Sequence, residues 1–385
     1  MESRNLLPES KLPDVKTTIF TTVGNLARKH HAIDLSQGFP NFGADPKLMQ
    51  LVSRAMQQGH NQYAAMPGYY GLRENIAEKI EKLHGRAYHP EKEITVTVGA
   101  TQALFTAITA FVHPGDEVIV IKPAYDCYEP VIELNGGRPV YVQLDAKGYR
   151  MDWEEFKEKI TPKTRMVIIN TPHNPSGKVF TKDDMLRLQE ILRNTNILLV
   201  SDEVYEHIVF DEKEHQSASR FDDLARRSFV CASFGKTFHV TGWKIGYCVA
   251  PEALMHEFRK THQFSVFCVD HPVQRAMAEY LRNEDHYLQL NSFYQEKRDY
   301  FLKALKSSKF KFTPSEGTYF QLLDYTQFSE ETDKDLALRL ITDHKLACIP
   351  ISSFNVGERQ DGVLRFCFAK KRETLEKAVE ILCRI

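Results

Sequence analysis

The chain has 385 residues, and its 42% hydrophobic and 26% charged content is typical of a globular protein. Its 50 basic and 51 acidic residues nearly cancel, and no block of like charge indicates a nucleic acid or a membrane surface as a partner. The seven cysteines are scattered and odd in number, which argues against a disulfide framework or a metal site and favours a reducing, cytoplasmic setting.

The N-terminal part predicts an arm followed by helices. Residues 1–16 are polar and contain prolines, as an extended arm does. Helical spacing of apolar residues follows at 17–31, and it returns at 46–58 and 71–85 after a turn at 36–40.

From residue 93 onward, continuous apolar runs alternate with helical patterns. This alternation is typical of a mostly parallel sheet that helices cover on both faces. We therefore predict an α/β fold, a three-layer sandwich around a mostly parallel seven-stranded sheet. The expected strands are residues 94–98, 117–121, 138–143, 166–170, 197–201, 229–233 and 245–249, with helices at 100–112, 127–134, 152–160 and 182–193.

The pattern changes in the C-terminal part. Helices are expected at 252–281, interrupted at Pro272, and at 287–307. Strands near Phe310 and at 319–323 and 363–368, with helices at 333–344 and 372–382, then give a small α+β domain. The predicted organisation is an arm and part of the small domain at 1–44, a large domain at 45–290, and the rest of the small domain at 291–385.

Three polar motifs follow predicted strands of the large sheet. Residues 99–102 join a strand to a helix, where free N–H groups and the Thr101 hydroxyl can cradle a phosphate. Two prolines within residues 170–177 make a rigid loop that holds Asn174 at the sheet edge. Asp202 ends a buried strand and needs a partner, such as a pyridinium nitrogen. Each motif also has a plain structural explanation: an ordinary turn for the first two, and a helix N-cap for Asp202.

The stretch from 228 to 251 carries one lysine at a predicted strand end. Gly235-Lys236-Thr237 resembles the end of a P-loop, but Val230 stands where that motif requires glycine. Ser233 and a second cation, Lys244, flank Lys236. An amine beside a phosphate anchor indicates a Schiff-base lysine for pyridoxal phosphate. A surface lysine on an ordinary turn is the alternative.

Arg365 interrupts an apolar strand near the C-terminus. A buried guanidinium needs an anion, and its planar fork matches a carboxylate. That carboxylate belongs either to a substrate or to an internal salt bridge.

Four stretches, SFGKTFHVTGWKIGY, NTPHNPSG, SDEVYEH and EGTYF, resemble fold-type-I, class I/II aminotransferases that depend on pyridoxal phosphate. The resemblance extends over essentially the whole chain. The stretches LPDVKTTIFTTV, IDLSQGFP, NQYAAMPGYYGLRE and YDCYEP are most similar to bacterial methionine aminotransferases, which are relatives of the kynurenine/glutamine aminotransferases.

The resemblance implies roles for individual residues. Lys236 would carry the cofactor and shuttle the substrate Cα proton, while Asp202 would face the pyridine nitrogen. Asn174 and Tyr205 would bind the ring oxygen, and Tyr125 would stack on the ring. Arg365 would bind the substrate α-carboxylate with help from Asn174 and the backbone of Gly38. The phosphate would be held by Ala100, Thr101, Ser233 and Lys244, with Tyr63 reaching across from a second subunit.

The implied function is ping-pong transamination of an L-amino acid with a 2-oxo acid acceptor, in an obligate homodimer with shared active sites. Methionine is favoured over glutamine, leucine and aromatic donors, because Thr101 replaces an aromatic residue of kynurenine-type relatives and Ile19 and Phe20 would line an apolar pocket. Plain packing in the small domain is the alternative role for Ile19 and Phe20. Three other functions stay open: a kynurenine/glutamine aminotransferase, a cysteine-S-conjugate β-lyase and a non-catalytic regulator that binds pyridoxal phosphate.

Overall fold

The computed structural model describes residues 9–385. Half of the predicted arm, residues 1–8, lies outside the described residues, and residues 9–18 form no helix or strand. No helix in the described part is long and apolar enough to cross a membrane. Between residues 9 and 385, no three His, Cys, Asp or Glu side chains gather as metal ligands would. All seven cysteines lie in this range and are free.

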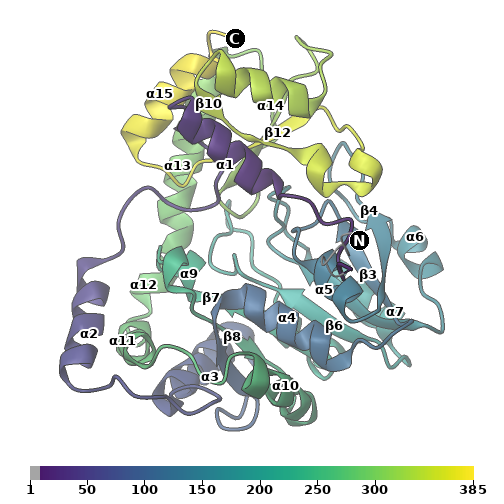
Figure 1. The fold of residues 1–385 in the computed structure, drawn as a ribbon, viewed down its shortest axis with the longest axis vertical. Helices are drawn as coiled ribbons and strands as arrows, with labels where there is room; N and C mark the ends of the chain where they lie inside the picture. The colour runs from purple at the N-terminus through teal and green to yellow at the C-terminus, as the bar shows by residue number, and fades with distance from the viewer. Residues whose placement is uncertain (1–8) are drawn as a thin grey trace, which may run out of the picture.

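A seven-stranded sheet forms the centre of the molecule (Figure 1), and its strand order is β2-β8-β7-β6-β5-β3-β4. Neighbouring strands from β7 to β4 run parallel, whereas β8 is antiparallel to both β2 and β7. All seven predicted strands are confirmed to within two residues. Their bounds are β2 (Ile94–Thr97), β3 (Glu117–Lys122), β4 (Arg138–Gln143), β5 (Thr164–Asn170), β6 (Leu198–Asp202), β7 (Ser228–Ser233) and β8 (Gly246–Val249).

Helices cover both faces of this sheet. Successive residues of each strand point to opposite faces, so each strand contributes side chains to two apolar clusters. In β3, Val118 and Val120 pack in one apolar cluster, and Ile119 and Ile121 pack in another. The first cluster includes α4 (Gly99–Phe111), α5 (Tyr128–Leu134) and α10 (Glu252–Ser265). The second includes α3 (Tyr70–His84), α6 (Trp153–Glu158), α7 (Lys182–Leu192), α8 (Asp222–Ala225) and α11 (His271–Leu281). The three-layer α/β sandwich is therefore confirmed.

The long helical region after β8 differs from its prediction. The chain leaves the helix at residues 266–270, and Pro272 lies in the first turn of α11 instead of interrupting a helix. Proline is tolerated there because the first N–H groups of a helix have no intrahelical acceptor, and the Asp270 side chain caps this end by accepting from the Val273 N–H. The expected helix at 287–307 is split into α12 (Asp285–Leu288) and α13 (Leu290–Ala304).

A smaller antiparallel sheet has the order β11-β12-β9, with β9 (Phe320–Asp324), β11 (Ile349–Pro350) and β12 (Val363–Cys367). The strand expected near Phe310 is wrong, since only an isolated bridge joins Lys311 to Asp324 there. The helices of this part are α14 (Asp333–Thr342) and α15 (Arg372–Leu382).

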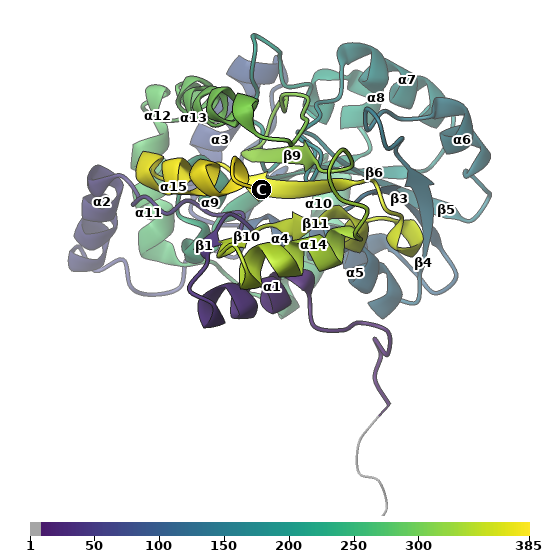
Figure 2. The ribbon, with the colours of Figure 1, turned by 90° about the horizontal axis from the view of Figure 1, so that it is seen from above.

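The N-terminal segment packs on this C-terminal part (Figure 2). β1 (Ile33–Asp34) pairs in parallel with β10 (Leu346–Ala347), and α1 (Ile19–Lys29) contacts α14, β10 and β11. α2 (Pro46–Gln57) instead packs on α11. The contacts agree with an N-terminal contribution to the small domain, while the boundaries at residues 44 and 290 stay a prediction.

Candidate active site

A cavity of about 150 Å³ lies where β5, β6 and β7 end and α4 begins. The carboxyl ends of parallel strands meet at one edge of a sheet, so motifs that follow different strands converge there. Nine predicted site residues line this cavity: Ala100, Thr101, Tyr125, Asn174, Asp202, Tyr205, Ser233, Lys236 and Lys244.

Lys236 belongs to the short helix α9 (Phe234–Thr237), directly after β7. Its Nζ donates a hydrogen bond to the carbonyl oxygen of Gly38 at 2.9 Å. Among the described residues, no carboxylate forms an ion pair with this amine. Burial lowers the pKa of Lys236 to about 8, and the cations Arg365 and Lys244 act in the same direction. At pH 7 about a tenth of this amine is therefore uncharged, far more than for an exposed lysine.

Asp202 is the last residue of β6 and is 3% exposed. Its Oδ2 accepts a hydrogen bond from the Tyr128 hydroxyl at 2.6 Å, and its Oδ1 accepts from the Val204 N–H at 3.3 Å. Burial raises the pKa of Asp202 to about 6, while the bond from Tyr128 opposes that rise. A turn follows β6, so Asp202 does not cap a helix.

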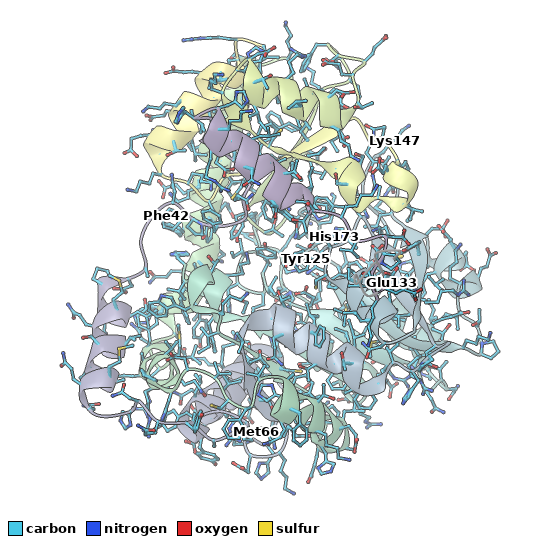
Figure 3. All side chains as sticks on the ribbon, in the orientation of Figure 1. Phe42, Met66, Tyr125, Glu133, Lys147 and His173 are labelled. Atoms are coloured by element: carbon cyan, nitrogen blue, oxygen red, sulfur yellow. The ribbon has the colours of Figure 1, made fainter. Side chains whose placement is uncertain are left out.

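The loop after β5 is fixed to its surroundings by side-chain hydrogen bonds. Asn170 donates to the carbonyl oxygen of Asp202 at 2.9 Å and accepts from the Asn174 N–H at 2.7 Å. His173, which is buried and labelled in Figure 3, bonds through Nε2 to the carbonyl oxygen of Pro123 at 3.0 Å and through Nδ1 to Ser176 Oγ at 2.6 Å. Burial lowers the pKa of His173 to about 4, so the ring is neutral and Nε2 is the donor. His173 thus joins the Asn174 loop to the loop of Tyr125.

One end of the cavity gathers hydrogen-bond donors. Helix α4 starts at Gly99, and no side chain caps its N-terminus. The Thr101 and Ser233 hydroxyls and the Lys244 amine line the same end, and Lys244 adopts a left-handed backbone conformation with φ of 51°. Uncapped N–H groups, two hydroxyls and a cation form a set suited to a phosphate.

Arg365 lies on β12 and is 1% exposed. Nη1 donates to Asn174 Oδ1 at 2.7 Å, Nη2 donates to the carbonyl oxygen of Ser36 at 3.0 Å, and Nε has no partner among residues 9–385. Its guanidinium carbon lies 3.9 Å from the centre of the Phe320 ring. No carboxylate in the described chain forms an ion pair with Arg365, which excludes the internal salt bridge within these residues.

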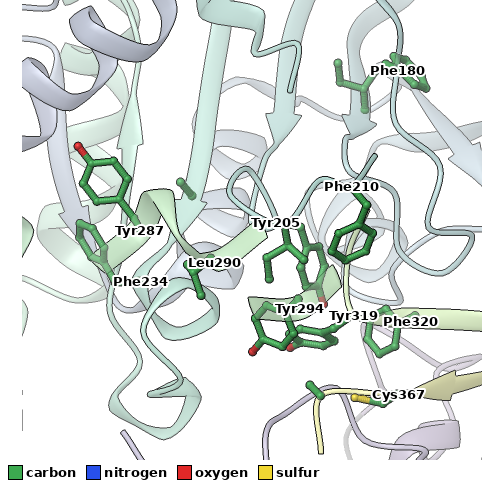
Figure 4. Packing of buried hydrophobic residues seen from close by; sticks show 14 of the residues in the cluster. Phe180, Tyr205, Phe210, Phe234, Tyr287, Leu290, Tyr294, Tyr319, Phe320 and Cys367 are labelled. Atoms are coloured by element: carbon green, nitrogen blue, oxygen red, sulfur yellow. The ribbon is translucent and has the colours of Figure 1, made fainter. Parts of the chain in front are cut away.

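Aromatic rings from separate segments pack against one another beside Lys236 (Figure 4), whose Nζ lies 5.8 Å from the Tyr205 ring centre and 5.5 Å from that of Tyr319. The Tyr205 and Tyr319 rings are nearly perpendicular with centres 5.1 Å apart, and Tyr319 also packs on Phe320. The Tyr319 hydroxyl donates to the carbonyl oxygen of Gly38 at 2.5 Å, so Gly38 accepts from both Tyr319 and Lys236.

Five predicted site residues do not line the cavity itself: Gly38, Arg365, Ile19, Phe20 and Tyr63. Gly38 and Arg365 are linked to it by the hydrogen bonds above. Ile19 and Phe20 both pack against the apolar cluster that contains Val23 and Phe354, and Phe20 also lies near Arg365, with 5.4 Å from its ring centre to the guanidinium carbon. Tyr63 is 80% exposed, and its ring contacts Phe267.

The structure adds residues that sequence reasoning missed. Tyr128 is the hydrogen-bond donor to Asp202, and Asn170 and His173 fix the Asn174 loop. Tyr319 belongs to the EGTYF stretch and Tyr128 to YDCYEP. Both residues therefore lie in motifs that carry the family resemblance, although no role was predicted for either of them.

Comparisons with known proteins agree with this geometry. The family model for aminotransferase class I and II matches residues 30–382. Methionine aminotransferase of Escherichia coli K12 is 46% identical over 99% of both chains. The crystal structure of an E. coli protein whose reactivity identified a methionine aminotransferase function has a TM-score of 0.96, with 45% identity over 99% of this chain and 100% of that one. N-succinyldiaminopimelate aminotransferase from Mycobacterium tuberculosis has a TM-score of 0.93, with 35% identity over 98% of this chain and 100% of that one. The chain belongs to the class I and II aminotransferase family, as its motifs predicted, and it is an aminotransferase.

Proposed function

We propose that this aminotransferase uses pyridoxal 5′-phosphate to transfer the amino group of an L-amino acid, preferably methionine, to a 2-oxo acid. One observation carries the proposal: the Lys236 amine, the Asp202 carboxylate and a phosphate-type donor set line the same cavity. These groups match the aldehyde, the ring nitrogen and the phosphate of the cofactor. The similarity to methionine aminotransferases over the whole chain supports the choice of donor.

The cavity residues fit the cofactor by their chemistry. Asn174 and Tyr205 supply an amide and a hydroxyl for the ring oxygen, and Tyr125 supplies an aromatic face for the ring. The uncapped start of α4, Ala100 included, with Thr101, Ser233 and Lys244, would hold the phosphate. When bound, pyridoxal phosphate acts as an electron sink that stabilises a carbanion at the substrate Cα.

Lys236 and Asp202 would move and hold protons. With its lowered pKa of about 8, Lys236 has enough neutral amine to accept the proton from the substrate Cα and to return it. Asp202, with a pKa of about 6, is mostly ionised at neutral pH and would keep a proton on the ring nitrogen. Both half-reactions of a ping-pong cycle would use these two residues.

Arg365 would orient the substrate. Among the residues that the structure describes, its guanidinium binds neutral groups on two nitrogens and Nε has no acceptor, so a substrate α-carboxylate would supply the missing negative charge. The rings of Phe20, Phe320 and Phe354 lie around this guanidinium. Such an apolar, aromatic wall suits the flexible thioether of methionine, and we propose that Ile19 and Phe20 contribute to it.

We further propose a homodimer in which Tyr63 from a second copy completes the phosphate site, in a cytoplasmic setting consistent with free cysteines. The exposed aromatic side chains Tyr63, Phe264 and Phe267 support this proposal, with exposed fractions of 80%, 91% and 42%. Exposed apolar groups of this size are usually covered by a partner. Sedimentation velocity would give a single dimeric species; a monomer with full activity would contradict a shared site.

A panel of single half-reactions tests the function. Purified enzyme is loaded with pyridoxal phosphate and mixed with methionine, glutamine, leucine, phenylalanine, kynurenine or a cysteine S-conjugate, while the absorbance of the lysine-bound cofactor is followed. Methionine is expected to give the highest rate constant divided by Kd. Failure to bind the cofactor, or no mass gain at Lys236 after borohydride treatment, would refute the proposal. Release of pyruvate from the conjugate without an acceptor would favour the β-lyase instead.

A further inference from the structure

The segment that follows β6 has buried side chains on two sides. Asp202 and Tyr205 line the cavity. Glu203, Glu206 and His207 do not line it and are nevertheless buried: Glu203 is 1% exposed, and the side chains of Glu206 and His207 are each 7% exposed. Charged groups are rarely buried without a partner, so the contacts on this second side need an explanation.

Glu203 has partners of its own, because its carboxylate is hydrogen-bonded to Ser201, His215 and the Ala218 N–H. The partner of Glu206 and His207 is Lys79 from α3, whose side chain is 3% exposed. Lys79 Nζ lies 2.6 Å from Glu206 Oε1, 2.8 Å from the Tyr247 hydroxyl and 3.0 Å from His207 Nε2. An ammonium group has three donors, and all three are used here. We call these four residues, Lys79, Glu206, His207 and Tyr247, the Lys79 network.

Two partners of Lys79 in this network are also hydrogen-bonded to each other. The Tyr247 hydroxyl accepts from Lys79 and donates to Glu206 Oε1 at 2.9 Å. Although burial opposes its charge, Lys79 holds the pKa of Glu206 well below its usual range. Burial and the Lys79 charge lower the pKa of His207 to about 3, so this ring is neutral and its Nε2 accepts from Lys79.

The network also joins two parts of the cavity wall. Glu206 is next to Tyr205 in the chain. Tyr247 lies on β8, three residues after Lys244, and pairs with Ala232 of β7, which is next to Ser233. One buried ammonium therefore connects the segment of Asp202 and Tyr205 to the strands that carry the donors at the phosphate-type end.

We infer that Lys79 is a positioning residue, which holds residues 202–207 so that Asp202 and Tyr205 face the cofactor. The inference rests on the proposed function, because it assigns these two side chains to pyridoxal phosphate. Without Lys79, the Glu206 carboxylate would be buried and unpaired, which is strongly unfavourable. The segment would then turn Glu206 toward water, and its neighbour Tyr205 would move with it.

A purely structural role for Lys79 is the rival explanation, and α3 offers a matched control. Arg73 lies on the same helix with a side chain that is also 3% exposed. It donates to the carbonyl oxygens of Gly68 and Pro90 and to Glu91 Oε2, at 3.1, 2.6 and 2.9 Å. None of these partners lines the cavity.

The test compares Lys79→Met, Lys79→Arg, Glu206→Gln and Arg73→Met in the full-length protein. Pyridoxal phosphate is titrated into cofactor-free protein to measure Kd, and the pH midpoint of the bound cofactor's absorbance change is recorded. Lys79→Met and Glu206→Gln should weaken binding by about tenfold or more, as the loss of a well-placed charged hydrogen bond does, and shift the midpoint. Lys79→Arg should restore most of the affinity. Arg73→Met should lower Tm and leave both readouts unchanged.

Hydrogen exchange of the cofactor-free proteins separates this inference from the proposed function. Lys79→Met should accelerate exchange selectively at residues 202–207, and Arg73→Met should not. If the wild-type chain binds no pyridoxal phosphate, the proposed function fails and the exchange result alone decides whether Lys79 fixes this segment. The inference is overturned if exchange and Kd of Lys79→Met match the wild type, or if Arg73→Met reproduces its effects. If Lys79→Met does not fold, Glu206→Gln decides by the same criteria.

Discussion

Residues 202–207 lie between two groups of buried charged side chains, which differ in how many of their hydrogen bonds are formed. On the cavity side, and within residues 9–385, Lys236 donates only to a backbone carbonyl and Arg365 keeps an unpartnered Nε. On the other side, every donor of Lys79 is used and its carboxylate partner is buried with it. Unused hydrogen-bonding capacity is costly in a folded chain unless a bound molecule completes it, whereas saturated groups fix the backbone. Lys236 and Arg365 therefore have the unused hydrogen-bonding capacity of ligand-binding groups, whereas Lys79 has the saturated contacts of a group that fixes the backbone.

The largest expected effect is the loss of catalysis in Lys236→Ala. The variant loses both the amine that binds the cofactor and the amine that moves the Cα proton, so turnover should fall by about 10⁴-fold or more. Because no carboxylate in the described part of the chain pairs with Lys236, its removal leaves no buried charge there unpaired, and Tm of the cofactor-free protein should not decrease. A steady-state assay and a thermal scan check both points. Near wild-type activity, or a drop in Tm as large as that of Arg73→Met, would contradict a ligand-binding role for Lys236.

The stability of the cofactor-free protein should rise with pH because of Lys236. Its folded pKa of about 8 lies below the value of about 10.4 expected in the unfolded chain. Between these values the unfolded state binds this proton and the folded state does not, so the free energy of unfolding increases with pH, by up to about 3 kcal/mol. Urea unfolding at pH 8 and pH 10 measures the increase. Lys236→Met should remove it, and Lys147→Met, at an exposed position, should retain it.

Arg365→Ala should mainly weaken amino-acid binding. Loss of the charged hydrogen bonds to a substrate carboxylate costs about 1.5–3 kcal/mol, which corresponds to a rise in KM of roughly 10- to 150-fold. The exposed Arg372, which pairs with Glu376 on α15, provides a control in Arg372→Ala. An unchanged KM in Arg365→Ala would show that this guanidinium has a structural role, as Lys79 does, and does not bind the substrate.

The smallest expected effect is that of Tyr128→Phe, which removes one hydrogen bond to Asp202. The pKa of Asp202 should then rise further, because this bond opposes the effect of burial. Affinity for pyridoxal phosphate should fall by about tenfold, and the acidic limb of the pH–activity profile should move to higher pH. Tyr141→Phe, which removes a bond to the half-buried Glu129, should change neither quantity.

The central sheet was predictable because most of its strands, which are four to seven residues long, contain a short continuous apolar run, such as Val118–Ile121 in β3 and Met166–Ile169 in β5. The helix Arg372–Leu382 and the strand Arg138–Gln143 have the bounds expected from the sequence. The strands β1, β10 and β11 have two residues each, too few to show any periodicity. Their pairing depends on contacts between the two ends of the chain, which local patterns do not contain.

The candidate site was largely predictable for a related reason: its motifs follow strands, and the topology brings strand ends together. The supporting residues were not. Tyr128 stands among apolar residues and looks like a core aromatic. Lys79 lies on an amphipathic helix of alternating charge, where a lysine normally faces water. Only the packing of α3 against the rest of the chain reveals that its amine is buried.

The surroundings of Gly38 leave no room for a side chain at this position. A Cβ atom on Gly38 would lie 2.8 Å from Cζ of Phe320, and that ring, 2% exposed, packs directly on the Arg365 guanidinium. Even alanine would therefore disturb the arginine through one intervening ring. A mutant library aimed at new amino donors should keep this glycine fixed and vary the wall around Phe20 instead.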